Sequence, residues 1–469
     1  MTRQEYSATG DVLYSATAKN GLRIRVLPKT GFSGFYAVFA TDYGGTYRRF
    51  ALNGTDYDTP AGVAHYLEHK MFDLPDGDSA LSLLSKNGAD PNAFTSSDVT
   101  CYYFRCTHLF EENLRLLLHF VSTPYFTEET VQKEQGIIGQ EIRMGDDSPG
   151  NANYYSLLKL LYKTHPIREK IIGTTESIAE ITAETLYTCH RAFYIPANMV
   201  LCVAGDVDPE HILAVAEEVL PQEAGTIPTV DFGEKEDLLP VGTRASLEMP
   251  VSIPQFLIGA KLHPEEKGPA LFRQQLTASL ALRLLAGPSS PFYNRLYAEG
   301  LINRSFDADA DFSTGIGTVI VGGESRDPEA VYDALLKELK RLDKEGIDRK
   351  LFERAHRSSI GGALRAMEEF DDVCVNLALD EFDGFCYLDY PAIMASISKE
   401  ECEVFLRETL KPERLAMSVV TAGTSSAEAG TSSAEAETSS GADAPPSPEG
   451  KAEENAAEAE ISSDAEGDV

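Results

Sequence analysis

The chain has 469 residues, 43% of them hydrophobic, and a formal net charge of −33 at pH 7. This length is too great for one hydrophobic core and predicts two or more domains, while the negative charge argues against nucleic acid as a partner. No apolar run approaches the ~18 residues of a membrane-spanning helix, and no signal-peptide pattern opens the chain. Seven Cys without a Cys-x-x-Cys pair are typical of reduced core thiols, so we expect a cytoplasmic protein without membrane contact.

The first predicted elements are strands. Residues 11–18 and 22–27 alternate around Asn20-Gly21, a strong hairpin signal, and a third strand is expected over 35–41. Pro60 is expected to open a helix that ends near Phe72, because proline is tolerated in a first turn. A short helix over 79–86 and one apolar, aromatic strand over 92–105 should follow.

Helices dominate the remainder of the first half. Apolar periodicity predicts helices over 108–122, 127–144, 151–162, 182–193 and 209–220, and a buried strand over 199–204. A stretch rich in Pro, Gly and acidic residues follows and is typical of an interdomain linker. We therefore assign the N-terminal domain to 1–224, the linker to 225–240, a C-terminal domain to 241–421 and a tail to 422–469.

Beyond the linker the same order of elements recurs faintly. The expected ranges are strands at 256–261, 317–322 and 414–420, and helices at 270–285, 328–342 and 349–370. The helix at 328–342 follows its strand as the helix at 108–122 follows the strand at 92–105. We interpret this as a second copy of one α+β unit.

The tail is of low complexity. Residues 424–429 are nearly repeated at 431–436, and roughly a dozen acids accompany the single Lys451. Such a segment cannot bury enough apolar surface to offset its ordering entropy, so we expect a solvated, disordered end. Binding of a partner by the tail is the alternative.

A metal-binding pattern lies in the helix after Pro60. His65 and His69 are four residues apart, so both imidazoles lie on one helix face and can bind one ion. Glu68 can reach the outer side of that ion, where a general base for water belongs. The order His-x-x-Glu-His is the inverzincin signature. Because the chain has nine His and a chance match is conceivable, a third ligand must be found.

Two acidic residues on the 127–144 helix are candidates for that ligand. Glu134 and Glu141 are seven apart and share one face. A catalytic zinc takes three protein ligands, so one carboxylate can bind the metal while the other orients a histidine. His108, His119 and His165 have no ligand spacing and are expected at the surface, in the core or in a loop.

These residues resemble the pitrilysin/insulinase family of zinc peptidases, on the branch of mitochondrial processing peptidase and nearest its YmfH-like bacterial proteases. The resemblance rests on residues 62–72, 92–95, 124–129, 134–141, 194–199 and 204–208. It implies that zinc is bound by His65, His69 and Glu141, with Glu68 as the base and Glu134 behind the ligands. It also implies an α+β fold of two similar domains, each a mostly antiparallel sheet packed with helices, arranged as a clam shell.

The family places an Asn-Ala-x-Thr stretch on an edge strand beside the zinc. The resemblance therefore implies that Asn92, Ala93, Phe94 and Thr95 bind a peptide substrate, which adds to the sheet through main-chain hydrogen bonds. Alternatively, Asn92 is only a turn residue before a strand.

The second half lacks the zinc motif and departs from the family in one respect. Active relatives carry there an Arg and a Tyr seven residues apart, which hold the substrate backbone and the oxyanion. Alignment on Gly300 places Leu296 and Asn303 at these positions, with Arg295 and Tyr297 nearby but out of step. We expect a related partner chain, in a heterodimer or homodimer, to supply the pair; a misalignment is the alternative.

The expected function is that of a zinc-dependent endopeptidase that cleaves peptides or unfolded segments. Two alternatives remain open. One is a non-catalytic or structural subunit of a two-chain peptidase. The other is a dedicated processor of one ribosomally made peptide precursor.

Overall fold

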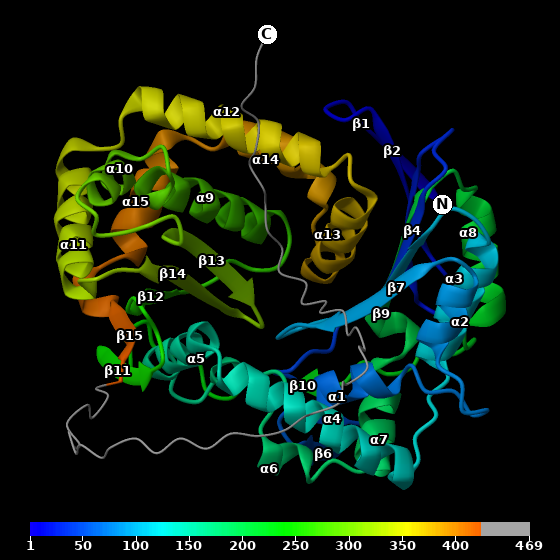
Figure 1. Cartoon of the computed structure of the whole chain (residues 1–469). Coiled ribbons are helices and arrows are strands. Elements are labelled where there is room, and N and C mark those ends of the chain that lie inside the picture. Colours follow the sequence, from blue (N-terminus) through cyan, green and yellow to red (C-terminus); the bar gives the residue numbers. More distant parts are fainter. Residues whose placement is uncertain (424–469) are drawn as a thin grey trace, which may run out of the picture. The chain divides into compact units, whose positions relative to one another are not determined.

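A seven-stranded sheet organises the first half of the chain (Figure 1). The structure, a computed structural model, describes residues 1–423, so the predicted acidic tail lies almost wholly outside the described residues. The strand order is β1-β2-β3-β9-β4-β8-β7, and only β3 and β9 are parallel neighbours. The strands are β1 (Thr2–Tyr6), β2 (Asp11–Thr17), β3 (Arg23–Pro28), β4 (Phe35–Thr41), β7 (Asp90–Thr95), β8 (Thr100–Cys106) and β9 (Met199–Gly205).

Helices pack on one face of this sheet and form the largest apolar core. Phe39 and Leu201 of the sheet belong to that core together with Leu117 and Leu186 of the helices. The helices of the first half are α1 (Val63–Lys70), α2 (Ala80–Lys86), α3 (Phe110–Ser122), α4 (Glu128–Asp146), α5 (Pro149–Leu161), α6 (Thr175–Ile178), α7 (Ala183–Phe193) and α8 (Pro209–Val219).

The second half repeats this topology. Its sheet has the order β11-β15-β12-β14-β13, with β11 and β15 parallel and all other neighbours antiparallel. This is the order and the strand direction of β3-β9-β4-β8-β7. The strands are β11 (Arg244–Met249), β12 (Gln255–Leu262), β13 (Asp307–Ser313), β14 (Ile316–Glu324) and β15 (Ala416–Ala422). The predicted α+β class with two similar units is confirmed.

The helices of the second half are α9 (Pro269–Ala286), α10 (Pro291–Ala298), α11 (Pro328–Glu345), α12 (Arg349–Ala366), α13 (Phe370–Asp383), α14 (Tyr390–Ser396) and α15 (Lys399–Thr409). In the described part of the chain, no helix combines the length and apolarity that a bilayer crossing requires.

Each sheet is covered on its other face by a helix from the opposite half. Helix α13 packs on β4 and β9, where Leu377 joins the cluster of Val38 and Cys202 (Figure 1). Reciprocally, α5 packs on β12 and β15, where Leu157 joins Ala416. Burying such side chains contributes ~1.5–3 kcal/mol each, so the two halves stabilise one another.

The predicted strand over 92–105 is wrong, because the structure divides it into the hairpin β7 and β8. The turn between them is held by Ser96, whose hydroxyl donates to Asp98 Oδ1 at 2.7 Å. Serine and aspartate favour turns through such side-chain bonds. The aromatic and β-branched residues on both sides of the turn conceal it in the sequence.

Other boundaries also differ from the prediction. Pro60 precedes helix α1, which begins only after Gly62, and the predicted helix over 349–370 ends at Ala366, before α13. Strand β1 precedes the expected hairpin. A small sheet, missed in the sequence, joins β5 (Arg49–Leu52) to β6 (Thr55–Asp58) and to β10 (Thr229–Val230), which lies in the expected linker. The assigned domain limits stay predictions.

A buried ion pair anchors that linker. Glu236 accepts hydrogen bonds from the backbone N–H groups of Lys163, Thr164 and His165 at 2.7–3.1 Å. Its Oε2 also lies 3.5 Å from Nζ of Lys261 on β12, and the two side chains are only 9% and 3% exposed. Burial opposes the charged form, yet the three N–H donors and Lys261 lower the pKa of Glu236 overall. One carboxylate thus links both halves.

We expect Glu236→Ala to lower the free energy of unfolding by about 3 kcal/mol, because Lys261 would be left buried without its partner. The control Glu234→Ala removes an exposed carboxylate of the same segment. Since the folded-state pKa of Glu236 is lowered, its contribution is present above its unfolded pKa of about 4.3. The difference between wild type and variant should therefore shrink as the pH falls below ~4 in urea titrations. A constant difference down to pH 3 would contradict this role.

Candidate metal centre

The histidine-bearing helix α1 starts at a close approach of two loops. Gly62 precedes it with φ +98°, and a Cβ there would lie 2.7 Å from the carbonyl oxygen of Ile172. Facing it, Gly173 has φ +81°, and a Cβ would lie 2.5 Å from the carbonyl oxygen of Ala61. Only glycine combines this backbone conformation with such contacts. The start of α1 is thereby fixed against residues 172–173.

Helix α4 presents the two carboxylates beside its buried stripe. It is capped by Thr127, whose side chain accepts from the Thr130 N–H in a capping box. Ile138 and Ile142 are buried in the main core. Glu134 and Glu141 lie two turns apart on the neighbouring stripe, so both face α1.

Two buried side chains of α1 dock it onto the first turn of α4. Tyr66 donates through its hydroxyl to the carbonyl oxygen of Val131, and Lys70 Nζ donates to the carbonyl oxygen of Thr130 at 3.3 Å. Tyr66 is fully buried and Lys70 is 1% exposed, with Asp73 as its ion-pair partner. These residues directly follow His65 and His69 in the sequence, so the docking face of the helix adjoins its metal face.

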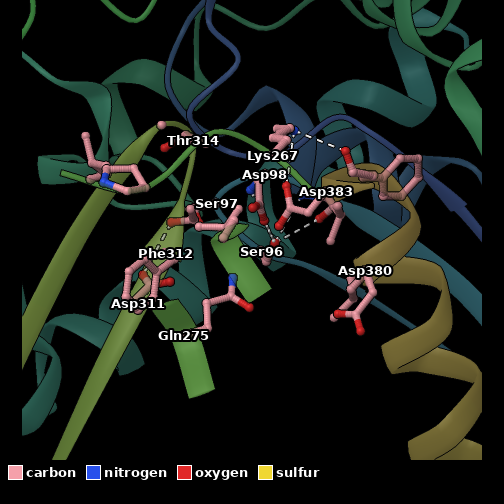
Figure 2. Close-up of a pocket in the computed structure, with 18 of the residues that line it drawn as sticks. Ser96, Ser97, Asp98, Lys267, Gln275, Asp311, Phe312, Thr314, Asp380 and Asp383 are labelled. Atoms are coloured by element: carbon pink, nitrogen blue, oxygen red, sulfur yellow. Dashed lines mark hydrogen bonds and ion pairs between the residues drawn. The ribbon is translucent and has the colours of Figure 1, made fainter. Parts of the chain in front are cut away.

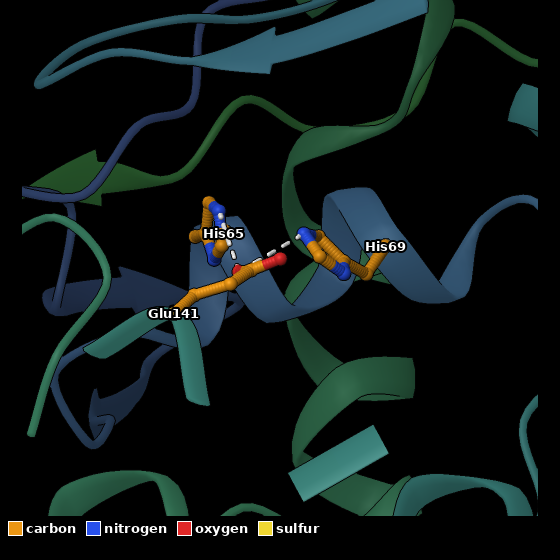
Figure 3. A group of neighbouring side chains, drawn as sticks. All are labelled: His65, His69 and Glu141. Atoms are coloured by element: carbon orange, nitrogen blue, oxygen red, sulfur yellow. Dashed lines mark ion pairs between the residues drawn. The ribbon is translucent and has the colours of Figure 1, made fainter. Parts of the chain in front are cut away.

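The structure brings His65, His69 and Glu141 together (Figure 3). Glu141 Oε2 lies 4.0 Å from His65 Nε2 and 3.7 Å from His69 Nε2. The three donor atoms lie within 4.8 Å of one another. Among the described residues, no other group of three His, Cys, Asp or Glu side chains is arranged in this way.

These donors fit zinc. Metal–ligand bonds of about 2.0–2.2 Å in a tetrahedron separate neighbouring donors by roughly 3.3–3.6 Å, close to the observed spacing. Burial lowers the pKa of His65 to about 3, with the neighbouring His69 adding to the effect, so the ring is neutral as a ligand must be. Two imidazoles and a carboxylate leave a fourth position open for water.

Glu134 lies behind His69 rather than in the donor group. Its Oε1 is 3.1 Å from His69 Nδ1, which orients the ring so that Nε2 faces Glu141. Burial alone would lower the pKa of His69, but Glu134 and the nearby Glu141 and Glu68 raise it. In turn, the bond to His69 lowers the pKa of Glu134. His65 has no equivalent, because its buried Nδ1 finds no hydrogen-bond partner among the described residues.

Glu68 is 8% exposed and lies close enough to His69 and Glu141 for their charges to affect its carboxyl, but it is not one of the three donors. Burial raises the pKa of its carboxyl, an effect that a hydrogen bond from Thr95 opposes. In that bond, Thr95 Oγ1 donates to Glu68 Oε2 at 2.5 Å. Sequence analysis assigned Thr95 only to substrate binding. The contact to the expected base could not be found from the sequence, since it depends on how β7 lies over α1.

Strand β7 is an edge strand, as the family resemblance implies. Its inner edge pairs with β8, and within residues 1–423 no strand pairs with its outer edge. Ala93 and Thr95 alternate with Asn92 and Phe94, so Asn92 lies on the face opposite the Thr95 hydroxyl. Asn92 is exposed, and its Oδ1 accepts from the Ala93 N–H at 2.9 Å. Its predicted role in substrate binding stays a prediction.

The positions aligned with the family's Arg and Tyr are occupied by structural residues. Leu296 on α10 is fully buried in the second core. Asn303 donates through Nδ2 to Glu324 Oε2 at 2.7 Å and accepts from the Ser305 backbone. Leu296 is thus part of the core, and the half-buried Asn303 amide is engaged with neighbouring residues.

Known proteins resemble the chain over most of its length. Family profiles described as insulinase (peptidase family M16) and as peptidase M16 inactive domain match residues 53–175 and 180–359. The chain is 37% identical to the uncharacterized zinc protease YmfH of Bacillus subtilis (strain 168), over 89% of this chain and 98% of that protein.

Solved structures show the same fold. The crystal structure of an M16-like peptidase from Alicyclobacillus acidocaldarius is 33% identical, with a TM-score of 0.84, over 88% of this chain and 99% of that chain. A protease from Helicobacter pylori shares the fold at 20% identity, with a TM-score of 0.75, over 87% of this chain and 99% of that chain.

The doubled α+β fold and the His-His-Glu donor group define the class of zinc peptidases. The chain belongs to peptidase family M16, the insulinase/pitrilysin family, and zinc is its metal.

We expect Lys70→Met to weaken zinc binding about tenfold, because α1 loses a bond that sets its distance from α4. The dissociation constant can be measured by competition with a fluorescent zinc chelator. Lys86→Met, which changes an exposed lysine at the end of α2, serves as the matched control. Zinc affinity equal to that of the wild type would show that Lys70 does not position the ligands.

Proposed function

We propose that the chain is a zinc-dependent endopeptidase that cleaves peptides or unfolded segments, with Glu68 as its general base. The proposal rests chiefly on one observation: a buried carboxylate, Glu68, lies within electrostatic reach of His69 and Glu141 without belonging to the group that these two form with His65. Zinc bound there would polarise a substrate carbonyl and lower the pKa of a water molecule.

The side chains then have distinct tasks. Glu68 accepts a proton from the attacking water and passes it to the leaving amine. Burial raises the pKa of the Glu68 carboxyl toward neutral pH, at which the group must both accept the proton from water and release it to the amine. The Thr95 hydroxyl holds the carboxylate in place, and Glu134 keeps the His69 ring in orientation.

The free edge of β7 supports binding of an extended substrate. A peptide can pair with the outer main-chain groups of the strand, which gives affinity with little dependence on sequence. The bound backbone would run past Thr95 and thus past the base. This favours peptides and unfolded segments over folded proteins.

We further propose that a related partner chain supplies the missing Arg and Tyr. The buried Leu296 and the hydrogen-bonded Asn303 support this, since leucine has no hydrogen-bond donor and the Asn303 amide already donates to Glu324. Loss of one such donor typically costs on the order of a hundredfold in rate. The complete donor group with Glu68 disfavours a purely structural subunit. Seven cysteines without disulfide bonds favour the cytoplasm as the location.

We expect Glu68→Gln to retain zinc but to lose turnover by about a hundredfold or more, since the amide cannot accept the proton. The measurement combines metal analysis with cleavage of an unfolded, internally quenched peptide. Glu129→Gln, an exposed position on α4, is the control and should leave both unchanged. Chelation should abolish cleavage by the wild type, and zinc should restore it. Full turnover by Glu68→Gln would refute the assigned base.

The partner proposal predicts that the purified chain alone cleaves the same peptide at about one hundredth or less of the rate of the assembled pair. A related chain that carries the Arg and Tyr should restore the rate, whereas the same chain with Arg replaced by Ala should not. Full activity of the lone chain as a monomer in light scattering would rule out the two-chain arrangement.

A further inference from the structure

A pocket of about 440 Å³ lies between helices α11 and α15 of the second half. Figure 1 shows the two helices side by side, on the side of the second half that is turned away from the first sheet. Ile347, which follows α11, donates its backbone N–H to Glu403 Oε1 of α15 at 2.7 Å and so ties the two walls together. The pocket volume lies in the usual range of ligand sites.

Leucines from both helices give the pocket apolar walls. Leu336, Leu339 and Leu342 of α11 pack against the second core but stay partly exposed. Leu406 and Leu410 of α15 are buried and belong to the same core. The partly exposed leucines leave apolar surface in a concave site, and a ligand that covers them removes this surface from water.

The charged residues around this apolar surface are mostly cationic. Five cationic side chains line the pocket with three acidic ones: Lys340, Lys344, Lys399, Arg407 and Lys411 with Asp343, Glu345 and Glu403. In the whole chain, by contrast, 74 Asp and Glu outnumber 41 Lys and Arg. The pocket therefore reverses the charge balance of the protein.

Two of the three carboxylates already have cationic partners. Glu345 pairs with Arg341, which lies outside the pocket lining, at 3.3 Å, and Glu403 pairs with Lys399 at 2.5 Å. These pairs leave Asp343 as the one remaining acidic group of the lining, against several cations.

Lys340 and Arg407 are the cations best placed to bind an anionic group. Both are exposed, and one comes from each helix. Lys340 makes no ion pair with any described residue, whereas its neighbour Arg341 makes two. Arg407 pairs only with Glu408 of its own helix, at 3.6 Å. Because exposed pairs of this kind contribute little free energy, both cations stay available to a ligand.

The cavity where the two halves meet has the opposite charge. It lies at the end of β7, where Ser97 Oγ of the β7–β8 turn donates to Ser313 Oγ of the β13–β14 turn at 3.2 Å. Figure 2 shows Asp98, Asp311 and Asp383 among the residues that line it. Since these carboxylates repel an anion, the two sites differ in the charge of the ligand that they accept.

We propose that the pocket between α11 and α15 binds an amphipathic anion, namely the acyl chain and carboxylate of a fatty acid. The chain lies against Leu336 and Leu339, and Lys340 and Arg407 bind the carboxylate. A small polar anion would leave the leucines exposed, and an uncharged apolar ligand would leave the cations without a partner. The pocket belongs to the second half and the metal centre to the first, so this inference goes beyond the proposed peptidase function.

The test measures ligand binding to the zinc-loaded full chain by calorimetry. The probe is decanoate below its micellar concentration, and decanol, which has the same chain without the charge, is the comparison. We expect decanoate to bind at least tenfold more tightly than decanol, and Lys340→Gln with Arg407→Gln to remove this difference. Lys337→Gln, at an exposed position on α11 outside the pocket lining, should leave the difference unchanged.

A second variant tests the apolar wall. Leu339→Gln should weaken the binding of decanoate and of decanol alike, by about tenfold, because a polar group then lies against the chain. Thermal melting shows whether each variant folds, and saturating decanoate should raise the melting temperature of the wild type. If Leu339→Gln does not fold, the exposed Lys340 and Arg407 still allow the charge comparison.

Equal binding of decanoate and decanol, or a loss in Lys337→Gln as large as that in the double variant, would overturn the proposal. Vesicles of phosphatidylglycerol present acyl chains and anionic groups in a membrane. Binding to these vesicles without binding of free decanoate would assign the surface to a membrane and overturn the fatty-acid assignment. Failure of the peptidase proposal is seen separately, as absent zinc or absent cleavage, and leaves these binding results intact.

Discussion

The site depends on the distance between two helices. The ligands His65 and His69 come from α1 and Glu141 comes from α4, so no single element can form the donor group. Helix α1 has only eight residues and would be marginal in isolation. It is held by the core, by the Gly62 contact at its start, and by the bonds of Tyr66 and Lys70 to α4. Metal affinity is thus a property of tertiary packing as much as of the motif.

The second sheet repeats the topology of the first, but among the described residues no group of metal ligands accompanies it. Helices α9 and α12 of the second half follow its strands as α1 and α4 follow those of the first, yet they bear no paired ligands. The second half instead contributes packing surfaces to the first. It places α13 on the first sheet and brings the β13–β14 turn, with its acidic residues, against the end of β7. The first half thus carries the metal-binding group, and the second half complements it.

The sequence predicted those features that depend on spacing along one element. The four-residue interval of His65 and His69, the seven-residue interval of Glu134 and Glu141, and the Asn20-Gly21 hairpin all follow from local geometry. The Ser96 turn was missed because β-forming residues surround it on both sides. The Thr95–Glu68 and Lys70–Thr130 contacts could not be predicted from the sequence, because they join elements whose relative positions are set only in the folded chain. Glu236 was hidden in the same way within an apparent linker.

The exchange of α5 and α13 between the sheets has a consequence for biosynthesis. Strands β4 and β9 leave the ribosome well before α13, which begins about 170 residues after β9 in the chain. Helix α13 covers one face of the sheet that these strands form. Until then the nascent first half exposes Val38, Cys202 and their neighbours. Neither half can therefore complete its native structure until nearly the entire chain has been synthesised. Folding should be late and dominated by contacts between residues far apart in the sequence. It should also depend on chaperones that protect the exposed apolar surface.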